Sequence, residues 1–156
     1  MKFLDSNVVL YAYLKPKRKL ELPERIKWRK KKSKEIIELV ENGSEEVLIS
    51  TVHLGEILNI LSKKHSIAVA TMFLAKVLKM NNINIAEVNR AIYEDSLSLS
   101  ITENIEPNDA LAIVVMQKYN CREILTFDYD FYNVKHIEKP LLKEEIKIFG
   151  KPGDLK

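Results

Sequence analysis

The sequence contains few of the residues that build disulfide or zinc frameworks. Its 156 residues include one cysteine, Cys121, and three histidines scattered along the chain, His53, His65 and His136. This content excludes a disulfide framework and a metal site built from cysteine and histidine ligands. A single unpaired cysteine also suits the reducing environment of the cytoplasm.

Long apolar runs are lacking as well. No run approaches the roughly 18 residues that a membrane-spanning helix requires. Only Lys2 precedes the short apolar start at Phe3 and Leu4, which is unlike a secretory signal peptide. With 46% hydrophobic residues, a chain of this length forms one domain that buries roughly two-thirds of its unfolded surface. We therefore expect a soluble, cytoplasmic protein with no membrane contact.

Positive charge is concentrated in one segment. Residues 15–34 contain 11 Lys and Arg against two Glu, a net charge of +9. The rest of the chain contains 14 Lys and Arg against 20 Asp and Glu, a net charge of −6. A basic segment of this density can neutralise the phosphates of a nucleic acid, which releases counterions. A solvated helix face would explain the same charges. The candidate RNA-binding residues are Arg29, Lys30, Lys31 and Lys32.

Short apolar strands alternate with helices along the chain. This alternation predicts an α/β fold with a mainly parallel sheet covered by helices on both faces. The helix that begins at Pro107 is apolar on every side, so we expect it to be buried. Pro16 ends the first helix, and no separate second domain is evident. The expected strands are residues 2–4, 47–49, 83–86 and 123–127, and the expected helices are 8–14, 23–40, 67–80, 87–101, one after residues 50–51 and one from Pro107.

Two acids follow strands directly. Asp5 comes after the first strand and Asp128 after the last. Ligands of parallel sheets bind beyond the carboxyl ends of the strands, so we expect both acids at that edge. Ser6 or Asn7 is expected to cap the helix that follows the first strand.

Two further acids lie on helices, and each has a simpler explanation. Asp109 is in the first turn of the buried helix, where an acid stabilises the helix dipole by about 0.3–1 kcal/mol. Glu56 is flanked by apolar positions on its helix, and a carboxylate there is costly unless a cation meets it. A partly exposed Glu56, or one paired with Arg or Lys, would explain its presence without a function.

If Asp5, Glu56, Asp109 and Asp128 meet, their charges repel one another unless a divalent cation neutralises them. Ligand sets made only of oxygens select Mg²⁺ or Mn²⁺. Such an ion can lower the pKa of a bound water for attack on a phosphodiester, and a second ion can stabilise the leaving oxygen.

Small polar residues stand next to these acids. Ser6 and Asn7 follow Asp5, and Thr126 precedes Asp128 by two residues. Side chains of this type orient metal ligands and their waters. They are therefore candidates for supporting roles.

Four segments together resemble the signature blocks of PIN domains, in their order and approximate spacing. They are residues 3–8 (FLDSNV), the isolated Glu56, residues 108–112 (NDALA) and residues 125–131 (LTFDYDF). The resemblance spans residues 1–137 and is nearest to the small VapC-like ribonuclease toxins of prokaryotic toxin-antitoxin pairs.

The resemblance implies a three-layer α/β/α sandwich in which residues 1–137 form the nuclease domain and residues 138–156 a C-terminal extension. It implies that single-stranded RNA is cleaved with Mg²⁺ or Mn²⁺, and that the partners are a second copy of the chain and a small antitoxin. The acids it assigns to metal binding and catalysis are Asp5, Glu56, Asp109 and Asp128, with Asn7, Thr126 and Asp130 in support.

Other functions remain open from the sequence. A non-catalytic RNA-binding or assembly subunit would keep the fold and the basic segment, although it has no evident need of the acids. A nuclease of RNA processing would share the site without being a toxin. A phosphatase of another α/β family needs a second acid two residues after Asp5, where Asn7 stands. Residues 15–34 are longer and more basic than the compact toxin pattern, which leaves the RNA target and the protein partner open.

Overall fold

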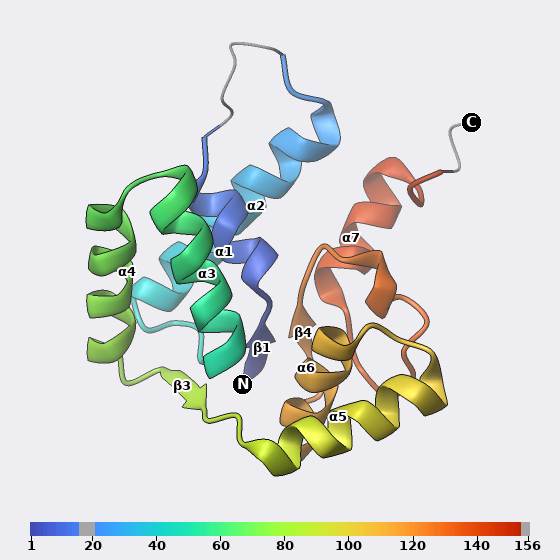
Figure 1. The fold of residues 1–156 in the computed structure, drawn as a ribbon. Helices are drawn as coiled ribbons and strands as arrows, with labels where there is room; N and C mark the ends of the chain where they lie inside the picture. The colour runs from blue at the N-terminus through green and yellow to red at the C-terminus, as the bar shows by residue number, and fades with distance from the viewer. Residues whose placement is uncertain (16–20, 154–156) are drawn as a thin grey trace.

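A computed structural model describes residues 1–15 and 21–153, and its centre is a parallel four-stranded sheet (Figure 1). The strand order is β3-β2-β1-β4, and every neighbouring pair is parallel, which confirms the predicted sheet. Phe3 of β1 lies between Leu48 of β2 and Ile124 of β4. The strands are β1 Lys2–Leu4, β2 Val47–Ser50, β3 Ile83–Ala86 and β4 Ile124–Leu125.

Helices occupy most of the remaining chain. Six of the seven α-helices in the described part of the chain correspond to expected segments, and one lies in the expected C-terminal extension. They are α1 Ser6–Tyr13, α2 Glu24–Glu41, α3 Thr51–Lys64, α4 Ile67–Lys79, α5 Arg90–Glu103, α6 Pro107–Lys118 and α7 Pro140–Phe149, with a short 3-10 turn, η1, at Tyr129–Phe131. Pro16, predicted to end the first helix, lies outside the described residues.

The sheet separates two hydrophobic cores, as the alternation of side chains along a strand requires. Leu4 and Leu125 point into a core shared with α1 to α4, whereas Phe3 and Ile124 point into a core shared with α5 and α6. Figure 1 shows α1 to α4 on one side of the sheet and α5 with α6 on the other. This arrangement is the predicted three-layer α/β/α sandwich.

Helix α6 is the most buried helix of the structure. Every residue from Ala110 to Met116 is buried, as its apolar sequence predicts. The helix therefore forms a rigid support for Asp109 in its first turn.

Two helix starts differ from the expectation. Asp5, rather than Ser6 or Asn7, caps α1, because its side chain accepts a hydrogen bond from the Ser6 amide. Glu106 caps α6 and accepts from the amides of Asn108 and Asp109. The Asp109 carboxylate is therefore not needed as a cap and remains available for another role.

Strand β4 is shorter than the expected strand at residues 123–127. It ends at Leu125 because side chains replace the backbone ladder beyond that point. The Phe127 amide donates to Asn7 Oδ1 at 3.3 Å, and the Asp128 amide donates to Thr126 Oγ1 at 3.0 Å. Polar side chains thus continue the alignment of β1 and β4 beyond the ends of these strands.

The segment after Ile137 packs against the sandwich. Leu141 and Leu142 of α7 are buried, and Leu141 belongs to the core beneath α1 to α4. The division of the chain at residue 137 stays a prediction. Within the described residues, no helix is long and apolar enough to span a bilayer.

Candidate metal centre

Asp5 lies at the carboxyl end of β1 with its carboxylate held on both oxygens. Oδ1 accepts from the Ser6 amide at 2.8 Å, and Oδ2 accepts from the Thr126 hydroxyl at 2.7 Å. Burial raises the pKa of Asp5, although the hydrogen bonds from Thr126 and Ser6 oppose the rise. The orientation of this carboxylate is therefore fixed by its neighbours.

Thr126 joins the ends of β1 and β4. Its hydroxyl donates to Asp5 and accepts from the Asp128 amide and from Asn7 Nδ2, at 3.0 and 3.4 Å respectively. One small side chain thereby sets the distance between the two segments that carry Asp5 and Asp128. The supporting roles of Thr126 and Asn7 stay a prediction.

Three carboxylates converge beyond the sheet edge. One oxygen from each of Asp109, Asp128 and Asp130 lies within 4.8 Å of the others. Asp109 comes from the buried α6, whereas Asp128 and Asp130 come from the turn after β4, where the Asp130 amide donates to Asp128 Oδ1 at 2.9 Å. Acids from two separate elements of the fold therefore meet at one point.

The electrostatics of this cluster disfavour three free charges. Burial raises the pKa of Asp109 to about 7, and the charged neighbours that add to the rise are the carboxylates of Asp128, Glu106, Asp5 and Asp130. The pKa of Asp128 is also raised, first by burial and then by Asp130, Asp5 and Glu106, against a hydrogen bond from the Asp130 amide. Carboxylates held this close together bind a cation readily, because the cation removes their mutual repulsion.

The donor set fits the predicted ion. Carboxylate oxygens are the ligands that Mg²⁺ and Mn²⁺ prefer. Because Asp109, Asp128 and Asp130 present three oxygens at short mutual distances, the residues present can hold such an ion.

Glu56 lies beside this cluster rather than within it. The Ser6 hydroxyl donates to Glu56 Oε2 at 3.0 Å and lies 3.5 Å from Asp5 Oδ1, so one serine connects the two acids. The Glu56 side chain is exposed, which removes the expected cost of burying it. Asp130, predicted in support, contributes to the three-acid group, whereas Glu56 and Asp5 adjoin that group.

Glu106 is a site residue that the sequence did not reveal. It caps α6, and its charge raises the pKa values of Asp109 and Asp128. Its position immediately before Pro107, at the start of a predicted helix, was a usable signal. Proline favours the first helical position and an oxygen-bearing side chain the position before it.

His53 is a second neighbour that the sequence did not reveal. The ring is buried, its Nδ1 lies 2.6 Å from Ser50 Oγ, and its Nε2 lies 4.0 Å from Asp5 Oδ1. Burial lowers the pKa of His53 to about 4 despite the charges of Glu56 and Glu106. The imidazole is therefore neutral at physiological pH, and no sequence pattern pointed to it.

The four basic candidates of α2 differ in their surroundings. Arg29 turns inward and forms an ion pair with the buried Glu145. Lys30 donates to the Leu14 carbonyl, and Lys32 pairs with Glu144 at 3.0 Å. Lys31 is exposed. The predicted RNA contact of Arg29, Lys30, Lys31 and Lys32 stays a prediction, with Lys31 the most accessible of the four.

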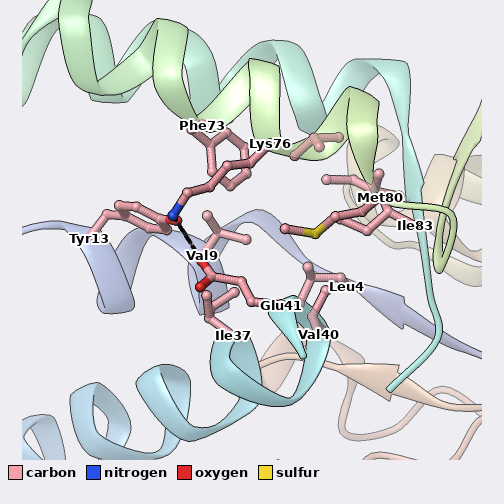
Figure 2. Close-up of a pocket in the computed structure, with 12 residues that line it drawn as sticks. Leu4, Val9, Tyr13, Ile37, Val40, Glu41, Phe73, Lys76, Met80 and Ile83 are labelled. Atoms are coloured by element: carbon pink, nitrogen blue, oxygen red, sulfur yellow. Dashed lines mark hydrogen bonds and ion pairs between the residues drawn. The ribbon is translucent and has the colours of Figure 1, made fainter. Parts of the chain in front are cut away.

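A separate hollow lies between α1, α2 and α4, away from the acids (Figure 2). Its walls are apolar side chains such as Val9, Val40 and Phe73, and a Lys76–Glu41 ion pair of 3.4 Å lies at its side. A volume of about 30 Å³ is far below that of a ligand pocket, and apolar walls leave such space dry. This hollow is a packing gap of the core rather than a substrate site.

Solved structures confirm the fold. A toxin-antitoxin complex from Klebsiella pneumoniae is similar with a TM-score of 0.63 and 18% identity, covering 90% of this chain and 98% of that chain. The sarcin-ricin loop cleaving toxin VapC20 from Mycobacterium tuberculosis is similar with a TM-score of 0.64 and 19% identity, and the match covers 88% of this chain and 98% of that chain. VapBC2 from Rickettsia felis, bound to a DNA fragment from its promoter, is similar with a TM-score of 0.58 and 17% identity, and the match covers 88% of this chain and 96% of that chain.

Sequence comparison identifies the family. None of the curated proteins compared with this chain matches it. The sequence model of the PIN domain matches residues 2–137, which include all of the predicted acids. The family consists of nucleases. The chain therefore belongs to the PIN-domain family.

Proposed function

We propose that this protein is a metal-dependent endoribonuclease that cleaves single-stranded RNA. The observation that carries the proposal is the convergence of Asp109, Asp128 and Asp130, with their neighbour Asp5, at the carboxyl edge of the parallel sheet. The raised pKa values of Asp109 and Asp128 mean that the cluster accepts a cation more readily than it tolerates its own charge.

Each residue of the site has a distinct task. Asp109, Asp128 and Asp130 would hold the ion. Asp5 lies beside them and is oriented by Thr126, and Ser6 connects Asp5 to Glu56. A Mg²⁺ or Mn²⁺ ion held there would supply charge stabilisation and an activated water for phosphodiester hydrolysis. Thr126 orients Asp5 and the Asp128 amide together, so the spacing of the acids is set before substrate arrives.

The RNA backbone is drawn to the exposed part of the basic segment. Lys31 is accessible on α2 and adds positive charge to a chain that is otherwise acidic. Each phosphate that such a side chain neutralises strengthens binding at low salt. The basic segment therefore contributes affinity without sequence specificity.

The similar structures favour a toxin of a toxin-antitoxin pair acting in the cytoplasm. One of them is a toxin-antitoxin complex and another is a toxin that cleaves the sarcin-ricin loop. We infer that this chain forms a homodimer and is inhibited by a small antitoxin from a neighbouring gene. Co-purification of the chain with the product of that gene, and loss of cleavage in the complex, test this part. An RNA-processing nuclease would cleave equally well with no such inhibitor.

Substitution of the acids tests the nuclease activity. Asp109→Asn and Asp5→Asn should each lower the rate of RNA cleavage in Mg²⁺ or Mn²⁺ by more than about 100-fold, since each removes a charge at the ion or beside it. Asp95→Asn, a matched change at an exposed position of α5, should leave the rate unchanged. Cleavage by both site variants at the parent rate would refute the proposal.

A further inference from the structure

The turn that carries two of the three clustered acids is anchored by the residue between them. Tyr129 lies between Asp128 and Asp130, and its hydroxyl donates to Glu145 Oε2 of α7 at 2.5 Å. Arg25 Nη1 donates to the same hydroxyl at 3.3 Å. The Tyr129 side chain is therefore held by partners on two helices, α2 and α7.

Glu145 is a fully buried carboxylate that is fully compensated. Its side chain has 0% exposure, and besides Tyr129 it accepts from Arg25 Nη1 at 3.0 Å, from Arg29 Nη2 at 3.0 Å and from Arg29 Nε. Burial acts to raise the pKa of Glu145, but the hydrogen bonds from Arg29, Tyr129 and Arg25 hold it below its usual value. Glu145 is thus a fixed anionic anchor at physiological pH.

The two arginines connect this anchor to the rest of the fold. Arg25 Nη2 donates to the carbonyls of Phe149 and Gly150 at 3.2 and 2.9 Å, at the end of α7. Arg29 Nη1 donates to the Tyr11 hydroxyl on α1 at 3.2 Å. Helices α1, α2 and α7 and the acid-bearing turn therefore share one network.

We propose that Tyr129, hydrogen-bonded to Glu145 and to Arg25 Nη1, is a positioning residue that fixes Asp128 and Asp130 in the geometry needed to bind a divalent cation. The turn is also held by local bonds, such as that from the Asp130 amide to Asp128, and by the buried side chain of Phe131, but neither fixes the side of the turn that carries Tyr129. A network rooted in three helices prevents the mutual repulsion of the acids from opening the turn. Hydrogen bonds that orient metal ligands typically change metal affinity by about 10- to 100-fold.

The anchor comes from a part of the chain beyond the family match. The PIN-domain match ends at residue 137, whereas Glu145 lies on α7. The inference rests on the proposed metal site, and it adds that α7 contributes to that site without contacting the ion. Helix α7 is thereby coupled to metal binding.

The test uses two tyrosines of the same network in the full-length protein. Tyr129→Phe removes the hydroxyl on the acid-bearing turn. Tyr11→Phe removes the hydroxyl of α1 that accepts a hydrogen bond from Arg29 of α2. Mn²⁺ binding to the metal-free proteins is measured by isothermal titration calorimetry, together with hydrogen exchange of residues 128–132 without metal. Tyr129→Phe should weaken Mn²⁺ binding about tenfold and speed exchange in the turn, whereas Tyr11→Phe should alter neither.

The outcomes separate this inference from the proposed function. Equal Mn²⁺ affinity in Tyr129→Phe and the parent would overturn the positioning role while leaving the metal site intact. Equal losses of affinity in both tyrosine variants would also overturn it, because the effect would then be general to the network. A parent protein that binds no Mn²⁺ would overturn the proposed function and this inference with it.

Discussion

Two carboxylates whose pKa values shift in opposite directions, Glu145 and Asp109, lie near the end of β4. Glu145 is buried among two arginines and a tyrosine, and its pKa is lowered. Asp109 lies among other carboxylates, and its pKa is raised to about 7. Burial acts upward on both, so the difference comes from the charge and the donors around each group.

The contrast between Glu145 and Asp109 distinguishes acids that are structural from acids that need a ligand. A buried carboxylate that is satisfied by guanidinium groups completes the fold by itself. A group of carboxylates without such partners destabilises the fold until a cation joins it. The chain thus uses two arginines of α2 to neutralise Glu145 of α7, and it leaves the adjacent cluster to bind a cation from solution.

Removing the charge of Glu145 should have the largest effect on stability. Glu145→Gln leaves Arg25 and Arg29 without their anion, and breaking a buried pair in this way costs about 3 kcal/mol. Urea unfolding of the metal-free protein measures the change. Glu144→Gln is the matched control, since its partly exposed pair with Lys32 contributes less than about 1 kcal/mol. Equal losses in the two variants would contradict the assignment of Glu145 as an internal anchor.

The same kind of change at Asp109 should have the opposite sign. Asp109→Asn removes one of the repelling charges, so the metal-free protein should gain about 1 kcal/mol of stability while it loses metal binding. Urea unfolding with and without Mn²⁺ measures both effects. If Asp109→Asn destabilised the metal-free protein, repulsion among the carboxylates would not control the stability of the cluster.

The pH dependence follows from the raised pKa of Asp109. A group whose pKa is higher in the folded state contributes stability below its unfolded value, and this contribution is lost as the pH rises through the folded value. The metal-free protein should therefore melt at a lower temperature at pH 8 than at pH 5, with the decrease extending to about pH 7. Thermal unfolding at each pH in EDTA measures this decrease, and millimolar Mg²⁺ or Mn²⁺ should abolish it. Asp109→Asn should show a smaller decrease than the parent.

Charge reversal on α2 should have the smallest effect, and only at an exposed position. Lys31→Glu should weaken RNA binding by a few-fold and reduce its salt dependence by about one phosphate contact, with little change in stability. Binding titrations at several salt concentrations measure the effect. Lys79→Glu at the end of α4 is a control of equal charge. Identical affinities in both variants would assign Lys31 to solubility or to a protein interface.

Much of the fold could be predicted from local pattern. Three-residue and four-residue apolar runs separated by helices specify a parallel sheet, and that topology brings Asp5 and Asp128 to one edge. The apolar helix that begins at Pro107 was expected to be buried, and the sequence placed Asp109 in its first turn. These features depend on the periodicity of side chains along each element, so neighbouring residues are sufficient to reveal them.

The partners of individual charges were not predictable in this way. The sequence presented Arg29 and Lys31 as equivalent members of a basic segment, yet one pairs with Glu145 and the other is exposed. Likewise, Asp130 enters the three-acid group and Glu106 adds its charge to the cluster, although neither assignment follows from spacing.

Local sequence patterns were enough to predict the succession of strands and helices along the chain, the burial of α6 and the sheet edge that carries Asp5 and Asp128. The tertiary structure alone decided which acids receive an arginine and which are left to repel one another. The physical reason is that electrostatic energy depends on distances of a few ångströms between side chains, and packing sets those distances among segments more than 100 residues apart, as between Arg29 and Glu145.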